Sequence, residues 1–323
     1  MIMHRLRALV QADFEAVNAL IMDKVHNHTG LIDDLSNHII QSGGKRLRPL
    51  IVLLASRACG YTGGDHHIIL AAMIEFFHTA TLLHDDVIDE SKLRRGRETA
   101  NEIWGDKVSI LVGDYLLTHY MKMMIQLGNL NIMALLTDTA YKITCGELKQ
   151  LENRHKTSMT ESAYFDIIQA KTSYLFAASA CLGALVTHAD ESMQTALYRY
   201  GIHLGNAFQL IDDALDYCDD PQTIGKNIGG DLQHGIATLP LLHAQKYASP
   251  AQQALIAQTL SHGSLEHLSE ILKAIEETRG IEHTKQVAAT EVERAIEALV
   301  ALPDSTYKTA LSELARYALA RDH

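Results

Sequence analysis

The feature that most constrains this chain is the spacing of its apolar residues over long stretches without proline. Only five prolines occur in 323 residues, at positions 49, 221, 240, 250 and 303. The stretches between them are rich in alanine, leucine, isoleucine, glutamate and glutamine, which favour helix. Apolar residues recur at intervals of three and four, as in LARYALA and VERAIEALVAL, and this is the period of an α-helix. We therefore predict an all-α protein.

Interruptions of this pattern divide the chain into helical segments. We predict helices over residues 10–40, 47–59, 67–91, 107–127, 131–152, 160–187, 191–218, 238–247, 251–260, 264–278, 281–301 and 304–321. None of the interruptions has the composition of a flexible interdomain linker. The expected architecture is one thick helical bundle formed by a single domain over residues 1–323.

Composition and charge exclude several classes of protein. The formal net charge of −11 argues against nucleic-acid binding through a general basic surface. The four cysteines are far apart in the sequence and show no CxxC spacing, so we expect reduced core thiols in a cytoplasmic protein. The N-terminal stretch meets charge too early for a signal peptide. No segment approaches 18 uninterrupted apolar residues, so no membrane span is expected.

An acidic cluster follows an apolar helical stretch at LLHDDVIDE, residues 82–90. Asp85 and Asp89 are four residues apart, which places them about 40° apart on one helix face. Asp86 is turned away from Asp85 by about 100°. Carboxylates on the same face repel each other, and a solvated acidic face would explain one such cluster by itself.

The same pattern occurs a second time in FQLIDDALDY, residues 208–217, with Asp212, Asp213 and Asp216. If the two helices face each other, carboxylates from both converge above an apolar interior, which is costly without cations. Mg²⁺ prefers oxygen ligands and combines one or two carboxylates with phosphate oxygens and waters. Histidine and cysteine are not placed for a zinc site. The repeated cluster therefore predicts Mg²⁺ and a phosphorylated substrate.

Cationic residues gather at the same places in this acidic chain. In GGKRLRP, residues 43–49, glycines and cations precede a helix that starts near Pro49. This arrangement can bind anions, although a basic surface turn explains the motif by itself equally well. His78 lies seven residues before Asp85 and shares its helix face, although a lone histidine is more often a structural core residue. Further candidates are Lys45, Arg46 and Arg48 in this motif, Arg94 and Arg95 after the first cluster, Lys171 and Thr172 in AKTS, and Lys226 after the second cluster.

Taken together, these motifs resemble the trans-isoprenyl diphosphate synthases, the polyprenyl synthetase family, and especially its bacterial long-chain members. The matching stretches are GGKRLRP, FFHTATLLHDDVIDES, LRRG, VGDYLL, GELKQL, KTSYLF, FQLIDDALDY and GKNIGGDL with TLPLLHA. They follow the family's order and cover roughly residues 40–245. The paired DDxxD clusters with the upstream GGKRLRP make the resemblance highly specific.

The resemblance implies an isoprenoid-synthase bundle with a central apolar channel, in which isopentenyl diphosphate is condensed repeatedly with an allylic diphosphate. It implies up to three Mg²⁺ ions, bound by Asp85, Asp89 and Asp212. The supporting residues Asp86, Asp213 and Asp216 are expected beside them, and Lys171 with the aspartates forms the catalytic set. The implied isopentenyl diphosphate site is Lys45, Arg48, His78 and Arg95. The implied allylic diphosphate contacts are Arg94, Lys171, Thr172, Gln209 and Lys226.

The family also implies a product, a subunit arrangement and a cellular role. Small residues at Ala80 and Thr81, below the first cluster, are expected to leave the channel open for a long product, although they could simply pack against a neighbouring helix. Met123 and Met124 are expected near the channel floor, or in the ordinary core. The expected product has about eight isoprene units, with seven to ten open, and serves as a quinone side chain. We further expect a homodimer, and membrane contact that is at most transient during product release.

The sequence departs from the family at two positions, and other readings remain open. Ile236 stands where long-chain members often have lysine, and Gly230 where aspartate is common, while Asp231 is kept. A terpene cyclase would share the fold and the first cluster but would leave GGKRLRP unexplained. A regulatory subunit without activity typically loses one DDxxD cluster, and here both are intact. A pure helical scaffold would not need two matching carboxylate clusters.

Overall fold

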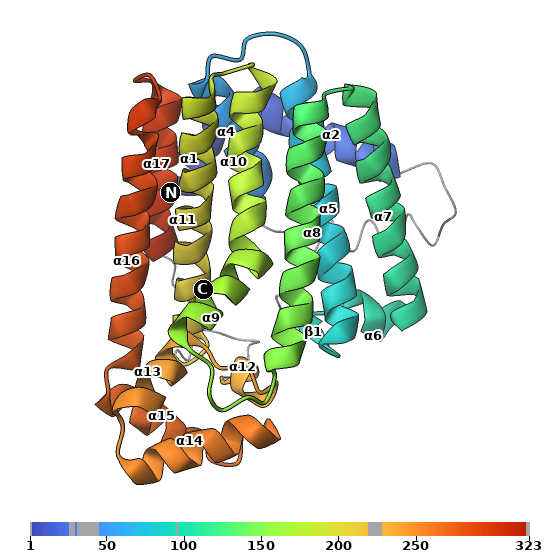
Figure 1. The fold of residues 1–323 in the computed structure, drawn as a ribbon. Coiled ribbons are helices and arrows are strands. Elements are labelled where there is room, and N and C mark those ends of the chain that lie inside the picture. The colour runs from blue at the N-terminus through green and yellow to red at the C-terminus, as the bar shows by residue number, and fades with distance from the viewer. Residues whose placement is uncertain (1, 26–29, 31–44, 95, 219–227, 321–323) are drawn as a thin grey trace. The chain divides into compact units, whose positions relative to one another are not determined.

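The protein is described here by a computed structural model, which covers residues 2–25, 30, 45–94, 96–218 and 228–320. Within these residues the fold is almost entirely helical (Figure 1), which confirms the predicted fold class. The helices are α1 (Ile2–Ala8), α2 (Gln11–Val25), α4 (Leu47–Ala58), α5 (His66–Ile88), α6 (Ala100–Trp104), α7 (Asp106–Leu127), α8 (Leu130–Asn153), α9 (Glu161–Ile168), α10 (Tyr174–Val186), α11 (Glu191–Leu215), α12 (Gly230–Gln233), α13 (Leu239–Tyr247), α14 (Pro250–His262), α15 (Leu268–Glu277), α16 (Gly280–Ala298) and α17 (Thr306–Leu319). A π-helical segment η1 (Gln169–Ser173), a 3₁₀ turn η2 (Leu299–Ala301) and a hairpin of β1 (Leu93–Arg94) and β2 (Arg97–Glu98) complete the elements.

The contacts between residues divide the chain into two compact units. Unit 1 consists of Met1–Thr137, Ala178–Tyr198 and Leu299–Leu314, and unit 2 consists of Asp138–Ala177, Arg199–Ala298 and Ala315–His323. Each unit is assembled from three stretches that are distant in the sequence, so neither can be separated by one cut in the chain. The single domain over residues 1–323 stays a prediction.

The core of unit 1 is built around α5, which packs against α2, α4 and α7. Its apolar residues Leu70, Met73 and Ile74 are completely buried. By length and composition alone, α5 could cross a membrane, and it is the one helix of the described residues that could. That is weak evidence for a span, because core helices have the same composition and 56% of its most apolar stretch is buried.

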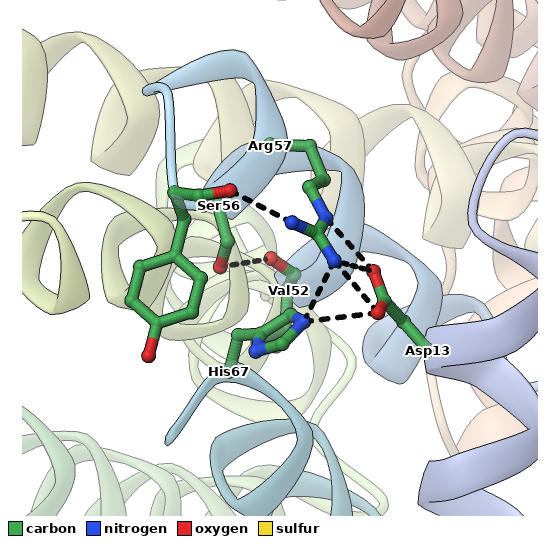
Figure 2. A network of polar contacts seen from close by, with 6 residues as sticks. Asp13, Val52, Ser56, Arg57 and His67 are labelled. Atoms are coloured by element: carbon green, nitrogen blue, oxygen red, sulfur yellow. Dashed lines mark hydrogen bonds and ion pairs between the residues drawn. The ribbon is translucent and has the colours of Figure 1, made fainter. Parts of the chain in front are cut away.

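A partly buried polar network joins three of these helices (Figure 2). Arg57 of α4 donates two hydrogen bonds from Nη2 and one from Nε to the Asp13 carboxylate of α2, at 2.7 to 2.8 Å. His67 of α5 lies with Nε2 3.2 Å from the same carboxylate. A bidentate arginine–carboxylate pair fixes orientation as well as distance, so the network sets how α2, α4 and α5 meet.

Unit 2 contains its own apolar core around α13, α14, α15 and α16. Leu241, Ile256, Leu260 and Ile275 are all completely buried in it. The ends of α14 follow local rules: Ser249 and Gln252 form a capping box, Pro250 occupies the first turn, and Gly263 ends the helix in the left-handed conformation.

Several local features differ from the predicted segments. The helix expected over 160–187 begins near its predicted start but is interrupted by the π-helical segment η1. The segment expected over 10–40 begins with α2, and a separate α1 precedes it; its residues 26–29 and 31–40 lie outside the described residues. The hairpin, α6 and α12 were not predicted. All four cysteines are free, and of these only Cys181 is fully buried.

Candidate active site

The first aspartate cluster lies at the C-terminal end of α5 in unit 1. Asp85 and Asp86 occupy its last turn, and Asp89 is the residue that ends the helix, with its amide donating to the Asp85 carbonyl at 2.8 Å. Carboxylates are unfavourable at this end because the helix dipole is negative there. Asp85 and Asp89 are half-buried on one face, whereas Asp86 is only 4% exposed.

Arg94 balances the buried carboxylate of this cluster. From β1 it donates to Asp86 Oδ1 through Nη2 at 2.7 Å and through Nε at 2.9 Å. Thr99 Oγ1 donates to the Ser91 carbonyl at 2.6 Å and holds the hairpin against the helix end. Arg94, predicted as a diphosphate contact, is therefore engaged with Asp86 in this structure. Arg95 lies outside the described residues.

Arg48 and His78 come together beside the same helix face. Arg48 Nη1 of α4 lies 3.1 Å from His78 Nε2 of α5. Arg46, just before α4, has a positive φ of 39° and pairs with Glu75 at 3.9 Å. The Lys45 carbonyl accepts a hydrogen bond from Arg7 at 2.6 Å. The start of α4 thus places two residues predicted to bind one diphosphate within hydrogen-bonding distance of each other.

The second aspartate cluster lies at the end of α11 in unit 2. Asp212 is half-buried, and the amide of Asp216 donates to its carbonyl at 3.1 Å. Asp216 Oδ2 in turn accepts from the Asp231 amide at 3.2 Å. Asp213 is 3% exposed and accepts hydrogen bonds from Tyr164 at 2.6 Å and from Gln209 at 2.7 Å.

The environment of Asp213 changes its acidity. Burial raises the pKa of Asp213 to about 7, and the charge of Asp231 acts in the same direction, although the hydrogen bonds from Tyr164 and Gln209 lower it. A buried carboxyl with a raised pKa beside other acids is typical of functional sites. Asp212 and Asp216 are only half-buried, so they are more accessible than Asp213, which instead lines the cavity described below.

The π-helical segment η1 supplies the residues that face the second cluster. Thr172 Oγ1 donates to Gln209 Oε1 at 2.6 Å, and Ser173 Oγ donates to Asn206 Oδ1 at 2.7 Å. A Cβ on Gly205 of α11 would lie 2.5 Å from the Ser173 Cα, so only glycine allows this approach. Single turns of π-helix occur frequently at functional sites.

A cavity of about 50 Å³ opens beside these residues, entirely within unit 2. Its wall carries two cationic side chains, two carboxylates, three amides and two hydroxyls besides apolar residues. It is lined by Gln150, Asn153, Arg154, Met159, Tyr164, Ile167, Ile168, Lys171, Gln209, Asp213, Asp231, Ile236, Ala237 and Thr238. A small concave site with converging charged groups suits a compact polar ligand group rather than a long apolar chain.

Comparison with known proteins now decides the family. A sequence model described as polyprenyl synthetase matches residues 29–278 of this chain. The chain belongs to the polyprenyl synthetase family. As a member of this family it is a prenyltransferase.

Individual relatives of this polyprenyl synthetase match along almost its whole length. Octaprenyl diphosphate synthase of Escherichia coli (strain K12) is 42% identical over 321 residues, which are 99% of each chain. The geranyl-diphosphate-specific all-trans-nonaprenyl-diphosphate synthase of Rhodobacter capsulatus is 41% identical, over 97% of this chain and 96% of its own. Among solved structures, a Caulobacter crescentus CB15 polyprenyl synthase complexed with calcium and isoprenyl diphosphate has a TM-score of 0.94 at 39% identity, covering 99% and 98% of the two chains.

The donor set of this polyprenyl synthetase fits Mg²⁺. The described residues contain no group of three or more histidine, cysteine, aspartate or glutamate side chains gathered as a metal site. Mg²⁺ does not require one, because it typically takes one or two carboxylates together with substrate phosphates and waters. Asp85 and Asp89 in unit 1 and Asp212 in unit 2 are oxygen donors of the right kind. Convergence of the two clusters stays a prediction because they belong to different units.

The polyprenyl synthetase site also contains residues that the sequence analysis did not single out. Tyr164 and Arg154 carry no motif of their own, and only their contacts in the folded chain reveal them. Asp231 was noted as kept, and the structure places it in the cavity beside Ile236. Ala80 is fully buried on α5, whereas Thr81 is half-buried on the face of His78 and Asp85. Met123 and Met124 of α7 are both buried, and Lys226 lies outside the described residues.

Proposed function

We propose that this protein is a long-chain trans-polyprenyl diphosphate synthase that condenses isopentenyl diphosphate repeatedly with an allylic diphosphate. The observation that carries the proposal is that each unit contains one aspartate cluster together with basic side chains that suit a diphosphate. Arg48 and His78 lie beside the face of Asp85, and Lys171 lies in the cavity beside Asp213. A cyclase acting on a single substrate would not need the first of these cation groups.

The basic and polar residues of the site divide into two sets, one for each substrate. Lys45, Arg48, His78 and Arg95 bind the isopentenyl diphosphate. Lys171, Thr172, Gln209, Lys226 and Arg94 contact the allylic diphosphate, with Arg94 acting through Asp86 in the arrangement seen here. Up to three Mg²⁺ ions, held by Asp85, Asp89 and Asp212, supply charge neutralisation at the departing diphosphate when bound.

The chemistry needs no covalent bond to the protein. The cationic side chains stabilise negative charge on the leaving diphosphate, so the allylic carbon–oxygen bond breaks and leaves a carbocation. The double bond of isopentenyl diphosphate attacks that carbocation and forms the new carbon–carbon bond. The departed diphosphate takes the proton that is then released. Apolar side chains around the reacting carbons exclude water, which would otherwise trap the cation.

The proposed product is octaprenyl diphosphate, made from farnesyl diphosphate and used as a quinone side chain. The full-length similarity to octaprenyl diphosphate synthases supports a product of this length. We place the protein in the cytoplasm as a homodimer, with transient membrane contact when the lipid product leaves.

A product assay tests this proposal directly. The purified chain is incubated with farnesyl diphosphate, labelled isopentenyl diphosphate and Mg²⁺, and the dephosphorylated products are separated by length. A single product near eight units is expected. Products of three or four units would contradict a long-chain synthase, and a folded chain that incorporates no label would contradict the enzyme.

Replacing Asp85 by asparagine tests the metal assignment. We expect turnover to fall at least about 100-fold, because an amide cannot supply the negative charge of a metal ligand. The matched control is Asp304→Asn, since the Asp304 side chain is fully exposed and pairs only with Lys308 in the described contacts. Turnover of Asp85→Asn close to that of the control would remove Asp85 from the catalytic set.

Thr81 provides the cleaner probe of product length. Thr81→Phe places a ring on the half-buried face one turn below Asp85, so we expect products shortened toward three or four units. Thr81→Ser is the control and should keep the original length. Ala80→Phe is less informative because Ala80 is completely buried, and overpacking costs about 1–3 kcal/mol in stability. Unchanged products from Thr81→Phe would show that this face does not line the channel.

A further inference from the structure

The loop that carries Ile236 is fastened to the end of α8. The amide of His155 donates to the Gly235 carbonyl at 3.0 Å, and the Ile236 amide donates to the Asp231 carbonyl at 2.9 Å. His155 adopts a positive φ of 63°, and its Nδ1 lies 3.2 Å from the Leu260 carbonyl of α14. These contacts hold residues 154–155 and 231–236 together as one local structure.

Close packing makes this arrangement specific. A Cβ on Gly235, which has a φ of 67°, would lie 2.4 Å from the His155 ring. Only glycine fits there, so the loop cannot shift away from α8 without losing its contact with the ring. His155 and Gly235 are the two anchor points of this contact. Their chain neighbours Arg154 and Ile236 both line the same cavity.

The cavity lining combines Arg154 with a second cationic residue, with amides and with the carboxylates of Asp213 and Asp231. Arg154 extends α8, with its amide donating to the Gln150 carbonyl at 3.0 Å. Lys171 of η1 is the other cationic residue of the lining, and Gln150 and Gln209 provide amides. Ile236 contributes only an apolar wall. A planar guanidinium can donate two hydrogen bonds to phosphate oxygens, which suits a diphosphate.

We propose that Arg154 binds the diphosphate of the allylic substrate in this cavity, in place of the cation that Ile236 does not supply. The inference rests on the proposed function, because it takes the allylic diphosphate to lie beside the second aspartate cluster. It adds a substrate-binding residue that no motif indicates, and it explains how a chain with isoleucine at 236 keeps two cations in this wall.

Four variants test the exchange of one cation for another. Arg154→Gln removes the positive charge at position 154, Ile236→Lys adds a positive charge at position 236, and the double variant combines the two changes. Lys149→Gln is the matched control, because Lys149 is exposed on the same helix and does not line the cavity. The readouts are the KM for farnesyl diphosphate, the KM for isopentenyl diphosphate and kcat.

We expect Arg154→Gln to raise the KM for farnesyl diphosphate about 10- to 100-fold, the effect of losing a hydrogen bond to a charged group. The KM for isopentenyl diphosphate should stay within about twofold, and Lys149→Gln should change neither value. The double variant should recover most of the loss. An unchanged KM for farnesyl diphosphate in Arg154→Gln, or no recovery in the double variant, would overturn the proposal.

A binding measurement keeps the test independent of turnover and of folding in Arg154→Gln. Calorimetry with inorganic diphosphate and Mg²⁺ should show tighter binding to Ile236→Lys than to the original chain, and weaker binding to Arg154→Gln. Equal affinity of the original chain and Ile236→Lys would overturn the assignment of this cavity. The original chain could make no polyprenyl product while the three affinities for diphosphate still rank as expected, with Ile236→Lys tightest and Arg154→Gln weakest. In that case the proposed function fails and the assignment of Arg154 stands.

Discussion

At the scale of single residues, the site depends on buried polar groups that satisfy one another. Thr172, Gln209, Asp213 and Tyr164 form a continuous line of hydrogen bonds from η1 through α11 to α9. Thr172, Asp213 and Tyr164 are buried, so each of them is costly to leave without its hydrogen-bond partner. The line therefore fixes the second cluster before any substrate arrives.

Tyr164→Phe removes one end of this line and should destabilise the protein. Asp213 would lose its shortest hydrogen bond while staying buried, at a cost of about 1–3 kcal/mol in the free energy of unfolding. That bond also lowers the pKa of Asp213, so the variant should hold a proton there more firmly. Urea denaturation of the variant and of the original chain measures the difference.

Tyr247→Phe is the control for this measurement, because Tyr247 is 59% exposed and makes a ring contact with His243 that phenylalanine keeps. Its stability should match that of the original chain. Equal stability of Tyr164→Phe and Tyr247→Phe would show that the bond to Asp213 contributes nothing.

The sequence predicted most of the charged residues of the site, but it did not predict Tyr164 or Arg154. The aspartates repeat with a spacing that has few explanations, so Asp85, Asp89 and Asp212 could be found from the pattern. A tyrosine on an apolar helix and an arginine after a helix are common everywhere. Only the fold, which brings Tyr164 to Asp213 and Arg154 to Ile236, separates these two from others of their type.

At the scale of elements, the helices follow the apolar period closely, whereas the irregular pieces do not. The segment predicted at 107–127 is α7 at Asp106–Leu127, because its apolar spacing continues to Gly128. The π-helical η1 has the composition of an ordinary α-helix, so no local sequence pattern indicates the extra residue in its turn. The short hairpin at Leu93–Arg94 was missed because two-residue strands carry no alternation.

The junction of α2, α4 and α5 should respond to pH through His67. Burial lowers the pKa of His67, and the charge of Arg57 acts in the same direction, against the opposing effects of Asp13 and Asp65. The unfolded chain therefore binds a proton at His67 more readily than the folded chain does. The contribution of His67 to the free energy of unfolding is complete above a pH of about 6.5 and is lost as the pH falls below that value.

His67→Gln tests this junction. We expect a loss of about 1–2 kcal/mol in the free energy of unfolding at pH of about 7.5, because the contact with Asp13 is gone, and a smaller fall on acidification. Denaturation midpoints at two pH values measure both effects. The exposed neighbour provides the control: His66→Gln should behave as the original chain does. An unchanged pH dependence in His67→Gln would assign the acid sensitivity elsewhere.

At the scale of the whole molecule, one exposed surface of α7 agrees with the proposed homodimer. Leu111, Met121 and Ile125 are 66%, 50% and 65% exposed. With 100° per residue they lie within about 80° of one another on the helix. The exposed Asp114 and Thr118 lie on the same face between Leu111 and Met121, so the stripe is mixed, and its exposed large apolar side chains favour an interaction surface.

Breaking this stripe should separate the subunits. We expect Leu111→Glu with Ile125→Glu to sediment as a monomer where the original chain sediments as a dimer, because paired carboxylates would be buried without partners. Val300→Glu is the control, since Val300 is 75% exposed and lies on η2 rather than on α7. A dimer that survives the double change would place the interface on another surface.

The bond between His155 and Gly235 also bears on how such chains change over generations. It keeps positions 154 and 236 beside one cavity. Two single substitutions can therefore move the cation of this cavity wall from one position to the other. A lineage that first acquires arginine at 154 passes through an ancestor with both cations, and the later loss of lysine at 236 is then harmless. If the lysine at 236 is lost first, the intermediate sequence has no cation at either position, and selection would remove it.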